Sequence, residues 1–201
     1  NNSQGVEVYD ILAYGIGGDF VKIGSSSNVR IHNNKLLDSG RQGVSVISGS
    51  DILIENNDFG KPGYYVLDVE PNNDTESATD IIFRNNTALG FGPETGVGHG
   101  FVACGSGEAY LNIGNITVTG NTLTGSSNAT LDSYFNQNQH RRLYNITFTN
   151  NKASQIRVGP VLEFKSIDGL TVKDNTQPLS SGSLYSITNS TGVISSPNTT
   201  N

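Results

Sequence analysis

Two carboxylates, Asp68 and Glu70, lie two residues apart in the apolar segment 66–70, which ends at Pro71. On a β-strand, residues i and i+2 face the same side and lie about 6.6 Å apart. Inverting glycoside hydrolases hold their two carboxyl groups roughly 6.5–9.5 Å apart, whereas retaining enzymes hold them about 5–5.5 Å apart. Asp68 and Glu70 are therefore our candidate catalytic pair, with an inverting spacing. The alternative is that Arg41 forms a surface ion pair with Asp68 or Glu70 that only fixes the loop.

Arg41, Tyr64 and His99 could bind or deprotonate a sugar. Arg41 can keep a carboxylate ionised or bind a sugar carboxylate through two hydrogen bonds. A lyase would need a base, such as Tyr or His, and a cation or Arg that neutralises a uronate. His99 lies in a Gly-rich stretch, where a simple turn residue is the alternative. Asp68 and Glu70 supply too few carboxylates for a typical Ca²⁺ site, so we expect no cofactor and keep Ca²⁺ as the weaker option.

A seven-residue phrase recurs six times and indicates how these residues are positioned. Each copy begins with a polar residue or Gly, has apolar residues at its second and fourth positions, and ends with a small polar residue and Asn. The copies start at residues 28, 51, 80, 115, 145 and 169. Alternating apolar and polar residues are typical of a half-buried strand. Starts that are at least 23 residues apart, with a variable excess, indicate a β-solenoid whose rungs carry loops of different length.

The last residue of every phrase is Asn. In stacked rungs, successive members of this column would lie about 4.8 Å apart. An amide side chain both donates and accepts hydrogen bonds, so each Asn can bond to the next one or to the turn backbone. We expect a structural ladder that consists of Asn34, Asn57, Asn86, Asn121, Asn151 and Asn175.

A second apolar segment precedes most phrases. We align residues 20–23, 43–47, 66–70, 101–104, 161–165 and, more weakly, 184–187, and we expect the strand of the remaining rung around 130–134. The alternation places Asp68 and Glu70 on the outer face. The two outward columns are then Lys22, Ser45, Asp68, Val102 and Glu163, followed by Gly24, Ile47, Glu70, Cys104 and Lys165. Glu163 thereby joins Arg41, Tyr64 and His99 as a candidate substrate-binding residue.

The strand phrase that ends in Asn-Asn resembles the repeats of right-handed parallel β-helices in the pectate-lyase-like superfamily, over about residues 20–196. Gly40-Arg-Gln-Gly43 followed by Asp68-Val-Glu-Pro71 resembles a subgroup of secreted bacterial and phage proteins, mostly of unassigned function. The resemblance implies an all-β, single-stranded right-handed parallel β-helix of about seven rungs. It also implies that an extended polysaccharide could lie along the outward face of the first strand column. The fold hosts lyases, hydrolases, epimerases, adhesins and tail proteins, so it does not select the chemistry.

The composition excludes several classes of protein. The net charge is −6 without a Lys/Arg block, which argues against a nucleic-acid partner. No apolar run approaches the roughly 18 residues of a membrane span. The single cysteine, Cys104, excludes an internal disulfide framework and a CxxC zinc motif.

We expect one β-helix domain over residues 1–201, with rungs over 20–196 and a tail at 197–201. Residues 1–19 form either an N-terminal cap or another rung. Open solenoid ends expose unpaired strands, so a homo-oligomer or an end-to-end stack that builds a filament is an option.

Several N-x-Ser/Thr sequences are candidate N-glycosylation sites, and they favour an extracellular or cell- or virion-surface protein only weakly, because the chain is rich in Asn, Ser and Thr. Those in or near the rungs are at Asn73, Asn85, Asn115, Asn128, Asn145 and Asn189.

Our leading hypothesis is an extracellular β-helix that engages a polysaccharide or surface glycan, as a hydrolase or a lyase. The alternative is a non-catalytic surface, adhesin, phage-tail or filament-forming module, so the sequence leaves open whether the protein is an enzyme. The patch of Arg41, Tyr64, Asp68 and Glu70 discriminates between the two hypotheses. The enzyme hypothesis predicts a groove there that contains a carboxylate with a raised pKa. The scaffold hypothesis predicts a flat, salt-bridged patch and tightly matched solenoid ends.

Overall fold

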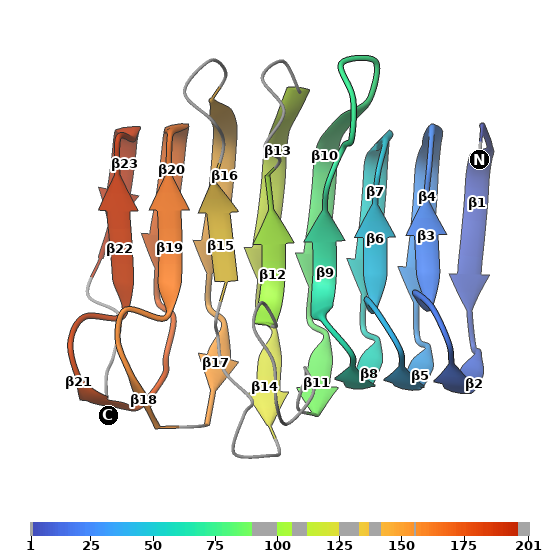
Figure 1. The fold of residues 1–201 in the computed structure, drawn as a ribbon, viewed down its shortest axis with the longest axis horizontal. Helices are drawn as coiled ribbons and strands as arrows, with labels where there is room; N and C mark the ends of the chain where they lie inside the picture. Colours follow the sequence, from blue (N-terminus) through green and yellow to red (C-terminus); the bar gives the residue numbers. More distant parts are fainter. Residues whose placement is uncertain are drawn as a thin grey trace.

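The computed structural model describes residues 2–89, 100–105, 112–124, 133–136, 142–154 and 156–196. In this part of the chain, successive strands wind into a parallel β-helix with three long sheets (Figure 1). Within each sheet, each strand pairs in parallel with the strands of the preceding and following rungs. No helix that could cross a membrane occurs among the described residues. The predicted fold class, an all-β parallel β-helix of about seven rungs, is confirmed by this architecture.

The strands are assigned to the sheets as follows. Sheet A contains β1 (Gln4–Tyr9), β4 (Ser26–His32), β7 (Gly49–Glu55), β10 (Ser77–Arg84), β13 (Asn112–Thr119), β16 (Leu143–Thr149), β20 (Ile167–Lys173) and β23 (Thr191–Ser195). Sheet B contains β2 (Leu12–Ile16), β5 (Lys35–Ser39), β8 (Asp58–Pro62), β11 (Thr87–Leu89), β14 (Thr122–Thr124) and β17 (Lys152–Ala153). Sheet C contains β3 (Val21–Ile23), β6 (Val44–Val46), β9 (Tyr65–Val69), β12 (Gly100–Cys104), β15 (Ser133–Asn136), β19 (Leu162–Lys165) and β22 (Tyr185–Thr188). A small fourth sheet pairs β18 (Arg157–Val158) with β21 (Leu179–Ser181).

The repeated phrase forms sheet A, and backbone geometry explains its polar positions. The first residue of every copy has a positive φ, from 51° at Asn28 to 77° at Gly169. The sixth residue also has a positive φ, from 55° at Asn85 to 67° at Gly120. Asn, Asp and Gly tolerate this left-handed conformation better than other residues. The phrase therefore keeps these residue types at the two positions where the backbone bends.

The six asparagines that end the phrases form a continuous hydrogen-bonded ladder. In its centre, Nδ2 of Asn86 donates to Oδ1 of Asn121 at 3.1 Å and to the carbonyl oxygen of Ile54 at 3.1 Å. Oδ1 of Asn86 in turn accepts hydrogen bonds from the backbone N–H and Nδ2 of Asn57. The same pattern links the other members of the ladder, which are all buried. Buried amides with every partner supplied stabilise the turn between sheets A and B.

Aliphatic and aromatic side chains from the three sheets fill the interior. Phe83 packs against Phe59 and Phe101 with ring centroids 6.0 and 5.7 Å away, and Phe135 stacks on Phe164 at 5.3 Å. All five rings are at most 1% exposed. Because each rung buries its inner face only against its neighbours, the core is one continuous cluster along the solenoid.

The register of β12 differs from our expectation. Val102 pairs with Leu67 and Cys104 pairs with Val69, so both point inward, and Ala103 takes the outward position beside Asp68. The predicted outward placement of Val102 and Cys104 is therefore wrong. This segment is entirely apolar, so alternation cannot define its faces, and a shift of one residue exchanges them.

The strand of the rung expected around 130–134 is β15, which spans Ser133–Asn136.

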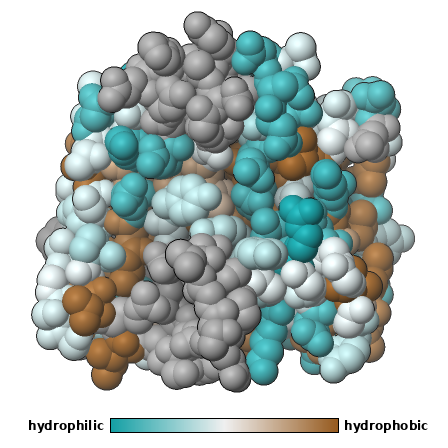
Figure 2. Space-filling model, viewed as in Figure 1, coloured by the Kyte–Doolittle hydropathy of each residue, from teal (hydrophilic) through white to brown (hydrophobic). Residues whose placement is uncertain are grey.

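Residues near the N-terminus form β1 and β2, which pair with β4 and β5 in the manner of the other rungs. At the other end, β18 and β21 lie at the lower left in Figure 1. Figure 2 shows hydrophobic side chains gathered at that corner, and Ile156 and Val158 of this segment are 68% and 64% exposed.

Candidate functional site

The outer face of sheet C brings residues from distant parts of the sequence into one column. Asp68 lies in this column on β9, with Ser45 on the preceding rung and Ala103 on the following one. Glu163 lies farther along, adjacent to Tyr134. Three rungs separate Asp68 from Glu163, which corresponds to roughly 14 Å. The complete column consists of Lys22, Ser45, Asp68, Ala103, Tyr134, Glu163 and Ser186.

Asp68 is a buried acid on the outer face of its strand. Its residue is only 6% exposed, and its Oδ2 accepts a hydrogen bond of 2.7 Å from Nε2 of Gln42. Burial raises the pKa of Asp68 to about 7, and the negative charges of Glu70 and Asp19 contribute to the increase. The hydrogen bond from Gln42 and the charge of Arg41 oppose this shift. Asp68 can therefore carry a proton near neutral pH.

Glu70 follows β9 and is exposed to solvent. Its backbone N–H donates to the carbonyl oxygen of Val46 at 3.0 Å, which extends the pairing of sheet C past the end of the strand. The two-residue spacing from Asp68 places both carboxyl groups on the same side of the chain. Asp68 and Glu70 thus occupy contrasting environments, one buried and one exposed.

Arg41 forms an ion pair with a residue that our sequence analysis missed. Its Nε lies 3.4 Å from Oδ1 of Asp19, and the Arg41 side chain is 55% exposed. Asp19 also accepts hydrogen bonds from the backbone N–H of Gln42 at 3.2 Å and from Oγ of Ser45 at 3.0 Å. Asp19, Gln42 and Tyr65 recur at 23-residue spacing, the shortest spacing of the phrase, and this periodicity is the signal that could have identified them.

Three tyrosines lie on or near the sheet C face around Asp68. Tyr64 donates its backbone N–H to the carbonyl oxygen of Arg41 at 3.0 Å, and its residue is 42% exposed. Tyr65 and Tyr134 meet edge to face with ring centroids 5.6 Å apart. Their strands lie two rungs apart, and Tyr65 is in register with Gly100 whereas Tyr134 is in register with Ala103, so the two rings meet diagonally across β12. Burial and the proximity of Tyr65 and Asp68 raise the pKa of the Tyr134 phenol.

The remaining candidate residues are distributed more widely. Glu163 is exposed on β19, whereas His99 and Asn128 lie outside the described residues. Of the other candidate glycosylation sites, Asn73 lies in an exposed turn and accepts hydrogen bonds from the backbone N–H and hydroxyl of Thr75. The exposed residues Asn85, Asn115, Asn145 and Asn189 occupy left-handed backbone positions.

Other titratable groups form structural contacts. Glu55 on sheet A accepts hydrogen bonds from Arg30 at 2.9 Å and from Arg84 at 2.6 and 2.8 Å, and these contacts lower its pKa. Cys104 is fully buried in the core, and burial raises the pKa of its thiol. Among the described residues, no cluster of three or more His, Cys, Asp or Glu side chains could hold a metal ion.

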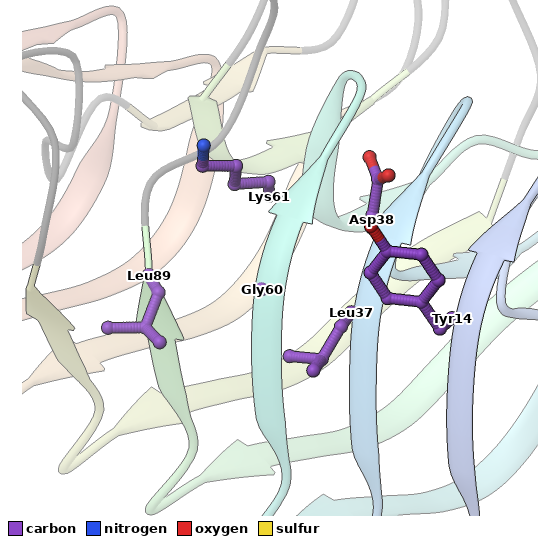
Figure 3. A pocket seen from close by; sticks show the side chains of 6 residues that line it. All are labelled: Tyr14, Leu37, Asp38, Gly60, Lys61 and Leu89. Carbon is purple, nitrogen blue, oxygen red and sulfur yellow. The ribbon is translucent and has the colours of Figure 1, made fainter.

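A cavity of about 370 Å³ lies on the outer face of sheet B (Figure 3). Leu37 and Leu89 supply apolar surface, and Tyr14 lies at one side. Asp38 and Lys61 are the charged residues of the lining. This cavity lacks the paired carboxylates of the sheet C face, which we therefore take as the candidate site.

The sheet C face combines a buried carboxyl group with a raised pKa, an exposed carboxylate and an aromatic pair. These groups belong to Asp68, Glu70 and the Tyr65–Tyr134 pair. Aromatic side chains with a polar end combine apolar contact with hydrogen bonding.

Comparison with known proteins agrees with this architecture. The family model described as "Right handed beta helix region" matches residues 19–200. No curated protein and no solved structure matches the chain. Because the family model covers most of the sequence and the strands form parallel stacked sheets, the chain belongs to the right-handed β-helix family.

Proposed function

We propose that the protein hydrolyses an extended polysaccharide that lies across the rungs of sheet C, and that it acts outside the cell or at a cell or virion surface. The observation that carries this proposal is the environment of Asp68. Its carboxyl group is buried on an outward-facing position, has a pKa raised to about 7, and lies two residues from an exposed carboxylate. A structural ion pair would instead lower the pKa of such a group.

In the proposed reaction, Asp68 is the general acid and Glu70 is the general base. Asp68 transfers its proton to the glycosidic oxygen as the bond from that oxygen to the anomeric carbon breaks. Glu70 removes a proton from the water molecule that attacks the anomeric carbon from the opposite face. The products are two shorter chains, one with a new reducing end of inverted configuration.

The neighbouring residues have binding roles in this proposal. Tyr65 and Tyr134 would contact the apolar face of a sugar ring on one side of Asp68. Tyr64 and the exposed part of Arg41 would also contact the chain, and Glu163 would lie at a more distant position along it.

A non-catalytic surface, adhesin, tail or filament module remains the second candidate. The observation that favours it is the ion pair between Arg41 and Asp19, since a salt-bridged patch is what a scaffold requires. A lyase is a further form of the enzyme hypothesis. It would use a base such as a tyrosine and would release an unsaturated uronate in place of a hydrated sugar.

A panel of neutral and uronate polysaccharides separates these functions. Reducing ends without ultraviolet absorbance of unsaturated uronates would support the hydrolase, and that absorbance would indicate the lyase. Removal of a general acid or base typically costs 10²–10⁴-fold in rate, so we expect such a loss in Asp68→Asn and in Glu70→Gln. Ser186→Ala, at the far end of the same column, is the control. Full activity in Asp68→Asn would overturn the assignment, and no cleavage of any glycan would favour the scaffold.

A further inference from the structure

Gln42 contacts Asp68 from the preceding rung with an amide whose orientation is fixed. Its Oε1 accepts the backbone N–H of Tyr65 at 2.8 Å, and its Nε2 donates to Oδ2 of Asp68 at 2.7 Å. A backbone N–H can only donate, so the amide atom that faces Tyr65 must be the oxygen. The atom that faces Asp68 is consequently the nitrogen, which can only donate.

The main chain of Gln42 is held as firmly as its side chain. Its N–H donates to Oδ1 of Asp19 at 3.2 Å. Its carbonyl oxygen accepts hydrogen bonds from the backbone N–H of Phe20 at 3.1 Å and from the hydroxyl of Ser39 at 3.2 Å. Gln42 is only 6% exposed. A side chain fixed at both ends in this way can select one orientation of the carboxyl group that it contacts.

The fixed amide decides which oxygen of Asp68 carries the proton. In a neutral carboxyl group one oxygen is a hydroxyl and the other is an acceptor. Oδ2 accepts the hydrogen bond from Gln42, and the carbonyl oxygen of a carboxyl group is a better acceptor than its hydroxyl oxygen, so the hydroxyl is favoured at Oδ1. No described residue forms a hydrogen bond with Oδ1, and Oδ1 is not among the described buried atoms that lack a partner. Oδ1 is therefore the oxygen that remains for a contact with a bound chain.

We propose that Gln42 is a positioning residue that keeps the transferable proton of Asp68 on Oδ1, directed toward the bound chain. The catalytic part of this role rests on the proposed hydrolase function, whereas the position of the proton does not. Gln42 also sets how strongly Asp68 holds its proton, because the hydrogen bond to Oδ2 favours the ionised form.

Titration of the Asp68 carboxyl by ¹³C NMR in two variants tests this role. In Gln42→Leu the donor is lost, and we expect the pKa of Asp68 to rise by roughly one pH unit. In Gln42→Glu the new carboxyl group can still accept the N–H of Tyr65 but must share a proton with Oδ2, so the pair should titrate in two coupled steps. Ser45→Ala is the matched control, since Ser45 bonds to Asp19 and not to Asp68.

Neutron diffraction at a pH below 7 locates the proton itself. A deuteron on Oδ1 is expected in the parent protein, and a deuteron on Oδ2 would overturn the proposal. An unchanged titration of Asp68 in both Gln42 variants would also overturn it. Gln42→Glu keeps the acceptor for Tyr65 and provides a folded variant if Gln42→Leu does not fold. Neither the titration nor the neutron measurement requires enzymatic activity. If the parent protein cleaves no glycan, the hydrolase function is refuted, but the titration and the neutron measurement still decide the role of Gln42.

Discussion

The raised pKa of Asp68 makes the stability of the fold depend on pH in a way that Asp68→Asn should abolish. At pH values between 3.8, the ordinary pKa of the carboxyl group, and about 7, its pKa in the folded protein, Asp68 is protonated in the folded protein and ionised in the unfolded chain. Stability therefore falls as the pH rises through this window, by about 1.4 kcal/mol per pH unit. Over roughly three pH units the loss is at most about 4 kcal/mol, and it is complete above pH 7.

Asn at position 68 is uncharged at every pH and can still accept the hydrogen bond from Gln42. Urea unfolding of the parent protein and Asp68→Asn, followed by circular dichroism between pH 4 and 9, measures the effect. We expect the stability of Asp68→Asn relative to the parent to increase from pH 4 to pH 8 by up to roughly 4 kcal/mol. Glu163→Gln, at an exposed position of the same column, is the control and should not show this increase. A difference between Asp68→Asn and the parent that stays constant with pH would refute the reasoning.

Three further predictions concern the core and the ladder. The hydroxyl of Ser133 is buried and has no hydrogen-bond partner in the described part of the chain, so Ser133→Ala should stabilise the protein by about 1 kcal/mol in urea unfolding, and a loss of stability would contradict this account. Asn86→Ala should destabilise it by about 3 kcal/mol or more in the same assay, because Asn57 and the carbonyl oxygen of Ile54 lose their buried partners; a cost below about 1 kcal/mol would show that the ladder is dispensable. Cys104 should react with a thiol reagent only after unfolding, given its complete burial, and rapid labelling of the native protein would contradict the register of β12.

The sequence predicted the fold because the phrase repeats a backbone requirement. Its polar first and sixth positions correspond to left-handed residues such as Asn28 and Asn85, and its final Asn corresponds to the ladder. These features are local, so they are visible in each copy separately. In β12 the local signal fails, since a strand with apolar residues throughout has no alternation to define its register.

The candidate site was only partly predictable. The outward position of Asp68 followed from its strand pattern, but its burial depends on contacts between rungs. Gln42 reaches it from the preceding rung, and Asp19 fixes Gln42 from one rung earlier. These contacts cross 23 residues or more of sequence, and periodicity shows that residues are neighbours without showing which side chains bond. For this reason the expected partner of Arg41 was Asp68 or Glu70, whereas the ion pair is formed with Asp19.

The pH dependence of kcat/KM on a glycan that the protein cleaves tests the central claim most directly. A general acid acts only in its protonated form. With Asp68 in that role, kcat/KM should be constant just below neutrality and should fall tenfold per pH unit above a pKa of about 7. A rate that increases through this range, or that does not change with pH, would contradict the assignment of Asp68 as the acid.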